Sequence, residues 1–327
     1  MSDTTYTQNY GQVGNVYNAQ NMYLPAEAVT GGQRPIPEEA TLAATLVDRV
    51  PQRDALIERI EAVSAEESFA LVAVVQGCSP DLHQALVTRC ARIELVEQFG
   101  GIGAWRYLKR LPWPPEGRGT VMGLLRDIRS KLSLPKDLDQ TGIEAAVRGL
   151  PTNICFSHFI DEAAWAADGG ALARAWIDYL ASDALRPAPG FRLVAFLCVE
   201  QREAELPAGG FAGLLARIGV FGGARPRQAA LDAFVDGLRA QYPLQDTAAR
   251  VIVPPPLGLI DRSDIGDWLS NAGTYLRNAA LEDQLMTLPN RLFEHGPHER
   301  HFDEVFAALQ TELANLMRPT RYVEVNL

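Results

Sequence analysis

The sequence predicts an α/β fold in which a mostly parallel sheet is flanked by helices on both faces. Short apolar runs rich in β-branched residues recur along the chain, and segments with helical periodicity separate them. Such uninterrupted apolar runs are typical of strands buried on both faces of a parallel sheet. The apolar share of 47% is large enough for a substantial core, which excludes a wholly disordered chain.

The elements follow in order after residue 37. Residues 1–37 have no long helical period, and the stretch Gly-Gly-Gln-Arg-Pro-Ile-Pro that ends at Pro37 is typical of a linker. We expect a helix over 38–63, broken at Pro51, and then a buried strand over 69–75. The strand Arg250–Val253 must end at Pro254, because a proline cannot continue a central strand.

The remaining segments continue the alternation of helices and strands along the chain. Helices are expected over 81–99, 120–132 and 172–180, with a proline-rich loop over 112–119, and strands over 153–160 and 191–199. Residues 263–317 look mostly helical. We therefore divide the chain into an N-terminal interaction segment and linker (1–37), an α/β domain (38–262) and a helical C-terminal subdomain (263–327).

Charge and cysteine usage exclude several classes of protein. The chain has 30 basic and 40 acidic side chains and no basic block, which argues against binding to nucleic acid or to an anionic membrane. Its longest apolar run is far too short to span a bilayer, and its first residues lack the pattern of a secretory signal. Four cysteines without a CxxC pair favour reduced thiols in the cytoplasm.

The segment after the first strand has the position of a phosphate-binding loop but not its chemistry. In the pattern G-x-x-x-x-G-K-[ST] that begins at Gly77, Leu82 replaces the second glycine, His83 the lysine and Gln84 the hydroxyl residue. These side chains supply neither the cation nor the magnesium ligand that a triphosphate needs. The sequence thus predicts no ATP hydrolysis and no cofactor. The segment is either an altered nucleotide pocket or, more simply, a turn at Gly77 followed by a helix that begins at Pro80.

Three further motifs resemble those of STAND-type signalling NTPases. Residues 47–56 look like their G-R-x-x-[EQ]-x-x-x-L motif, with Asp48 at the glycine position, and residues 254–269 are similar to the motif that leads into their helical lid. Asp161 and Glu162 follow an apolar strand, at the Walker B position. In this order, over about 38–320, the motifs resemble inactive STAND-like domains of bacterial conflict (immune) systems such as antiphage defence.

That resemblance implies a degenerate P-loop fold with a helical C-terminal lid. It also implies a non-catalytic scaffold, sensor or adaptor that recruits an effector protein encoded nearby through protein–protein contacts. Two other classes remain open: a divergent nucleotide- or small-molecule-binding switch that uses the crevice at the carboxyl ends of the strands, and a Cys–His hydrolase.

The N-terminal segment carries a second resemblance. Residues 8–21 are rich in Asn and Gln interleaved with Tyr and Val, a composition that favours stacking of identical strands. Gly11, Gln12, Val13 and Gly14, followed by Asn15, resemble the core of RIP homotypic interaction motifs and of bacterial amyloid-signalling motifs. The resemblance implies homotypic self-assembly; an ordinary hairpin or a flexible tail is the alternative.

Other side-chain groupings have a structural interpretation beside a chemical one. His295, His298 and His301 could bind zinc, although Gly296 and Pro297 break helical spacing, so we expect a polar loop and no metal site. His158 and Cys198 lie near the ends of successive predicted strands and could form a nucleophilic pair, or simply be buried. Asp161 and Glu162 could act as acid and base, or cap a helix. Trp105 and Trp113 could contact a partner, or pack in the core.

Overall fold

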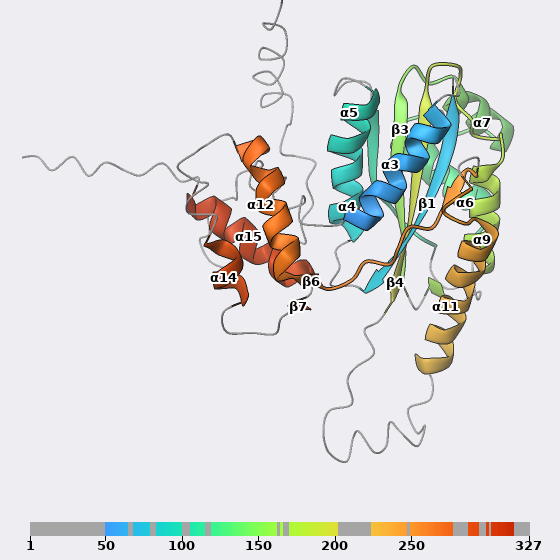
Figure 1. Cartoon of the computed structure of the whole chain (residues 1–327). Coiled ribbons are helices and arrows are strands. Elements are labelled where there is room, and N and C mark those ends of the chain that lie inside the picture. Colours follow the sequence, from blue (N-terminus) through green and yellow to red (C-terminus); the bar gives the residue numbers. More distant parts are fainter. Residues whose placement is uncertain are drawn as a thin grey trace, which may run out of the picture. The chain divides into compact units, whose positions relative to one another are not determined.

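A computed structural model describes most of the chain in two compact units (Figure 1). The described residues are 50–64, 68–78, 83–99, 105–114, 119–161, 164–165, 170–201, 224–246, 249–276, 287–293, 299–300 and 302–316. One unit comprises residues 48–260 with 299–303, and the other comprises 1–47, 261–298 and 304–327. Among the described residues, no helix is both long and apolar enough to cross a membrane.

The larger unit is built on a five-stranded sheet. Its strands are β1 (Phe69–Cys78), β2 (Trp105–Leu111), β3 (Asn153–Ile160), β4 (Arg192–Gln201) and β5 (Val251–Ile252). They lie in the order β2-β3-β4-β1-β5, and every neighbouring pair is parallel. The mostly parallel sheet that the sequence predicts is therefore confirmed, and this order places β1 between β4 and β5.

Helices cover both faces of this sheet, as expected (Figure 1). One face carries α3 (Val50–Ser64), α4 (His83–Arg89), a π-helical turn (Cys90–Glu94) and α5 (Leu95–Phe99). The other carries α6 (Val121–Lys131), α7 (Gln140–Arg148), α9 (Ala171–Ala181) and α11 (Ala224–Gln241). Side chains alternate along β1, so Val72 and Val74 face the α9 side while Leu71 and Val75 face the α3 side.

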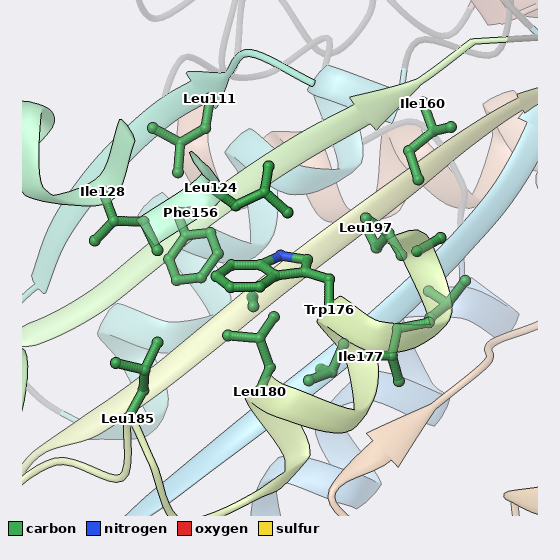
Figure 2. Close-up of a cluster of buried hydrophobic side chains, with 14 of the residues drawn as sticks. Leu111, Leu124, Ile128, Phe156, Ile160, Trp176, Ile177, Leu180, Leu185 and Leu197 are labelled. Atoms are coloured by element: carbon green, nitrogen blue, oxygen red, sulfur yellow. The ribbon is translucent and has the colours of Figure 1, made fainter. Parts of the chain in front are cut away.

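The core on the α9 side is centred on Trp176, which is fully buried (Figure 2). Its ring lies beside Phe156 of β3, with Leu180 and Ile177 of the same helix nearby. Burying so many large apolar side chains on one face supplies most of the drive to fold, at about 25 cal/mol for each Å² of apolar surface removed from water. The apolar face of α9 therefore fixes this helix on the sheet.

Several elements differ from the expectation. Strand β2 and helices α7 and α11 were not expected from the sequence. Pro51, where a break was expected, lies in the first turn of α3, and residues 38–49 before this helix lie outside the described residues. Pro51 is tolerated there because the first backbone N–H groups of a helix have no partner within the helix. Strand β2 is an edge strand with charged side chains and a register shift after Leu108, so it lacks the continuous apolar run of a central strand.

The second unit contains α12 (Arg262–Leu276), α14 (Leu288–Phe293) and most of α15 (Phe302–Leu316). Asp261 begins α12: its carboxylate accepts hydrogen bonds from the backbone N–H groups of Ser263 and Asp264, at 2.6 and 3.0 Å. The Asp264 carboxylate in turn accepts from the Asp261 N–H at 2.7 Å, which completes a reciprocal cap. Trp268 of α12 is fully buried. Two further short strands, β6 (Ile260–Asp261) and β7 (Glu299–Arg300), pair with each other.

Candidate functional site at the carboxyl ends of the strands

The candidate site lies where β1, β3 and β4 end and α4 begins. Of the residues expected to form it, the structure describes Gly77 at the end of β1, His83 and Gln84 in the first turn of α4, and Asp161 directly after β3. Leu82, Glu162 and the N-terminal motif from Gly11 to Asn15, with Gln12, Val13 and Gly14 between, lie outside the described residues.

Gln84 stands where a phosphate-binding loop has its hydroxyl residue, and its amide is committed to other partners. The side-chain nitrogen donates to the Tyr107 hydroxyl at 2.6 Å and to the Thr88 hydroxyl at 3.1 Å. Burial raises the pKa of the Tyr107 phenol, so this hydroxyl stays neutral. Gln84 thus ties α4 to β2 and fills the position of a magnesium ligand with a structural hydrogen bond.

His83 stands where the same loop has its lysine, and it is almost entirely buried, with 2% of its surface exposed. Its ring meets the Phe159 ring edge-on, with centroids 6.3 Å apart. The Arg110 guanidinium lies over the same phenylalanine ring, 4.6 Å from its centroid. A buried imidazole packed against an aromatic ring cannot reach out to phosphate oxygens as a lysine ammonium does.

Carboxylates give this edge of the sheet an acidic character. Glu200 of β4 is half-buried, and its pKa is raised by burial and further by the nearby Asp161, while Arg110 acts to lower it. The Asp161 carboxylate accepts a hydrogen bond from the Ala164 N–H at 2.7 Å, and the Asp161 carbonyl accepts from the Trp165 N–H at 2.9 Å. Asp161 therefore caps the turn after β3.

Gln76 braces the end of β1 and was not among the residues expected at this site. Its amide donates to Asp232 of α11 at 3.3 Å and accepts from Arg239 of α11 at 2.7 Å. The Gln76 carbonyl accepts from the Leu257 N–H at 2.8 Å. A buried glutamine within an apolar strand was the sequence signal that could have identified it. For Tyr107 and Glu200 there was no comparable signal.

The structure does not support a Cys–His nucleophilic pair. His158 and Cys198 lie on neighbouring strands, but His158 pairs with Leu197 and Cys198 pairs with Phe159, so the two side chains face opposite sides of the sheet. Burial raises the pKa of the Cys198 thiol well above its usual value and lowers the pKa of His158 to about 4. His158 and Cys198 therefore cannot act as the nucleophilic pair that the sequence suggested, because a thiolate and its base must lie on the same side of the sheet.

His158 itself lies fully buried among aromatic rings. The rings of Trp113, Phe156 and Trp176 meet it edge-on, with centroids 5.6 to 5.7 Å away. Together with the backbone carbonyls of Leu111 and Pro112, they complete its surroundings. Trp105, the other tryptophan near the proline-rich loop, is 9% exposed and packs against Phe99. Both tryptophans thus pack within the domain.

This burial predicts a pH-dependent stability. Because the folded pKa of His158, about 4, lies below the usual value of 6.5, the fold favours the neutral imidazole. The contribution of neutral His158 to the free energy of unfolding is fully present above pH 6.5. This contribution, about 2 to 3 kcal/mol, is lost as the pH falls from 6.5 towards 4. We expect urea unfolding of His158→Phe to lack this component between pH 7 and pH 4. Parallel pH curves for the two proteins would contradict the assignment.

Other candidate groupings gain nothing from the structure. Within the described part of the chain, no three His, Cys, Asp or Glu side chains gather as a metal site would require. Three histidines, His295, His298 and His301, lie outside the described residues. That they form a polar loop without a metal site stays a prediction. The thiols of Cys90, Cys155 and Cys198 are free and buried, in agreement with a structural role.

Comparison with known proteins yields only distant likenesses. No protein-family model matches the chain, and no curated protein matches it. The ORC2 protein of Aeropyrum pernix is similar in its ADP form with a TM-score of 0.41, 12% identity and coverage of 87% of this chain and 67% of that one. In its ADPNP–ADP complexes the TM-score is 0.37, with 12% identity and coverage of 75% of this chain and 54% of that one.

PCH-2 of C. elegans is similar with a TM-score of 0.31, 10% identity and coverage of 86% of this chain and 74% of that one. The chain thus spans about half to three quarters of the length of these proteins. At 10 to 12% identity the likeness concerns the fold alone.

Proposed function

We propose that this chain is a non-catalytic adaptor whose P-loop-like domain does not hydrolyse nucleoside triphosphates and which acts through protein–protein contacts. The observation that carries the proposal is the pair of hydrogen bonds from Gln84 to Tyr107 and Thr88. Both donors of this side-chain amide are used within the domain's framework, and Gln84 has no hydroxyl to offer a magnesium ion at this position. The buried His83 and the half-buried Glu200 support the same conclusion.

The finer part of the proposal is a signalling role in a bacterial conflict system. It is supported by the order of the sequence motifs along the chain, which resembles that of inactive STAND-like domains. On this proposal an effector encoded nearby is the partner, and the motif from Gly11 to Asn15 mediates self-assembly. Neither feature depends on nucleotide chemistry.

A second candidate, a nucleotide- or small-molecule-binding switch, is favoured by one observation. The Gln76 carbonyl at the end of β1 is hydrogen-bonded to Leu257, and the Gln52 amide of α3 donates to the Pro256 carbonyl at 2.8 Å. The segment that leads along the chain into the second unit is therefore attached to the strand end. A ligand that displaced β1 here would also displace that segment.

A calorimetric titration with Mg-ATP separates the two candidates. We expect no binding tighter than about 1 mM, because neither a lysine nor a hydroxyl serves the phosphates. The titration is repeated with ADP and with magnesium omitted. In the same preparation, the full chain should co-purify with the product of an adjacent gene and form assemblies that a chain starting at residue 38 does not form.

Magnesium-dependent binding of ATP at micromolar concentration would overturn the adaptor proposal. If that binding disappeared in His83→Ala, the strand-end crevice would be its location and the switch would replace the adaptor. Failure of the truncated chain to differ from the full chain would instead remove the self-assembly role of the N-terminal motif alone.

A further inference from the structure

The charge of this chain is unevenly distributed. Between Trp105 and Lys136 there are eight basic and two acidic side chains, a net charge of +6 in a chain whose total is −10. These cations do not form a run in the sequence; most of them lie on β2 and α6, which pack against each other.

Five of these cations lie close to one another in the structure. Arg106 of β2 donates a hydrogen bond from its guanidinium to the Lys131 carbonyl, at 3.2 Å, so it lies at the carboxyl end of α6. The Arg129 guanidinium donates to the Lys136 carbonyl in the turn that follows. Arg126 is exposed one turn earlier on α6. We call Arg106, Arg126, Arg129, Lys131 and Lys136 the basic surface.

The basic surface is not neutralised within the described part of the chain. None of its five side chains lies within 4.0 Å of a carboxylate there. Two acids adjoin it in sequence, Asp127 beside Arg126 and Asp137 beside Lys136. Burial raises the pKa of Asp127, and Lys131 acts to lower it. The helix dipole stabilises cations at the carboxyl end of a helix, which explains why Arg106 and Arg129 can lie at the end of α6 without a carboxylate partner. It does not account for Arg126 and Lys136, whose side chains are exposed and make no such contact.

Strand β2, which carries Arg106, is one of the two edge strands of the sheet. In the order β2-β3-β4-β1-β5, strand β2 pairs with β3 on one side, and among the described residues no strand pairs with its other side. The main-chain groups of an edge strand can form hydrogen bonds with a further extended segment. The register shift after Leu108 limits this edge to the first half of β2, where Arg106 lies.

We propose that the basic surface and the β2 edge together bind an acidic, extended segment of a partner protein, which adds to the sheet as a strand beside β2. Main-chain hydrogen bonds would provide the attachment, and the five cations would select carboxylate side chains. This inference rests on the proposed adaptor function and specifies its partner. A nucleic acid is less favoured because it offers no strand to the edge, and because the acidic remainder of the chain would repel a long polyanion.

The test uses the full chain and a fluorescein-labelled octapeptide of alternating Glu and Val, with a Gln–Val peptide as the uncharged control. Binding is followed by fluorescence anisotropy at about 50 and about 300 mM salt, since screening weakens contacts between exposed charges. The variant Arg126→Glu/Lys136→Glu reverses two exposed cations of the basic surface. The matched control, Arg148→Glu/Arg262→Glu, makes the same change of net charge at exposed positions on α7 and α12.

We expect the Glu–Val peptide to bind the native chain and the control variant equally, within about twofold, and the basic-surface variant about tenfold more weakly at low salt. Hydrogen exchange of the β2 amides should slow in the complex, which contact between charges alone would not cause. Equal binding to both variants, or unchanged exchange in β2, would overturn the proposal. So would tighter binding of a single-stranded oligonucleotide of about 20 thymidines at the same salt.

These outcomes are separate from the nucleotide titration. Binding of Mg-ATP would overturn the adaptor role and leave the peptide result unchanged. Loss of peptide binding in the basic-surface variant, in a chain that does not bind Mg-ATP, is the combination that both proposals predict.

Discussion

Replacement of Gly170 by alanine is expected to lower the free energy of unfolding by about 4 kcal/mol. Gly170 is the N-cap of α9 and has a φ of +82°, a conformation that residues with a Cβ atom adopt only at a cost. A Cβ atom here would also lie 2.0 Å from Cη2 of the Trp165 ring, which is buried and cannot move aside freely. Backbone strain and steric overlap therefore add.

Gly190→Ala is the matched control for this prediction. Gly190 has a similar φ of +89°, but an added Cβ atom would meet nothing within 4 Å. The Gly190→Ala variant should lose only the part of the free energy of unfolding that comes from backbone strain, about 1 to 2 kcal/mol. Urea unfolding followed by circular dichroism measures both variants at pH 7. Equal losses would show that the Trp165 ring is not the obstacle that the structure places beside Gly170.

How far the sequence predicted the fold depended on where each strand lies in the sheet. Strands β1, β3 and β4 are central, so both of their faces are buried and their sequences are continuous apolar runs. Strand β2 has one neighbour and carries Arg106 and Arg110 at exposed positions, so no such run marks it. Local hydrophobicity reports burial and not strand structure as such. The other edge strand, β5, was predicted because Val251, Ile252 and Val253 are buried, whereas the exposed arginines of β2 hid that strand.

The candidate site was predictable in position but not in its contacts. The end of an apolar strand followed by a helix locates Gly77, His83 and Gln84, and the substitution of the lysine and hydroxyl is readable from the letters alone. The hydrogen bond from Gln84 to Tyr107 joins two residues on elements that only the sheet order brings together. A contact of this kind depends on topology, and Tyr107 lies on the strand that was missed.

The Arg59→Met variant is expected to lower the free energy of unfolding by about 4 kcal/mol. Arg59 of α3 is 1% exposed. Its guanidinium donates to the carbonyls of Ala249, Leu244 and Val251 at 2.6, 3.1 and 3.3 Å. Burial lowers the pKa of this guanidinium, and Asp246 acts to raise it. Methionine fills a similar volume but leaves these carbonyls, just before and within β5, without their donor.

Arg53→Met makes the same substitution on the same helix, two turns earlier, where the side chain is 30% exposed and pairs with Asp54. Since an exposed ion pair contributes little, this control should change the stability by less than about 1 kcal/mol. Arg59→Lys should fall between the two, because an ammonium keeps the charge but cannot reach carbonyls of both the loop and the strand at once. If urea unfolding gave Arg59→Met and Arg53→Met the same stability, α3 would be held by its apolar face alone. A graded loss from Arg53→Met through Arg59→Lys to Arg59→Met would show that one buried guanidinium fixes the approach to β5, the strand next to the candidate site's β1.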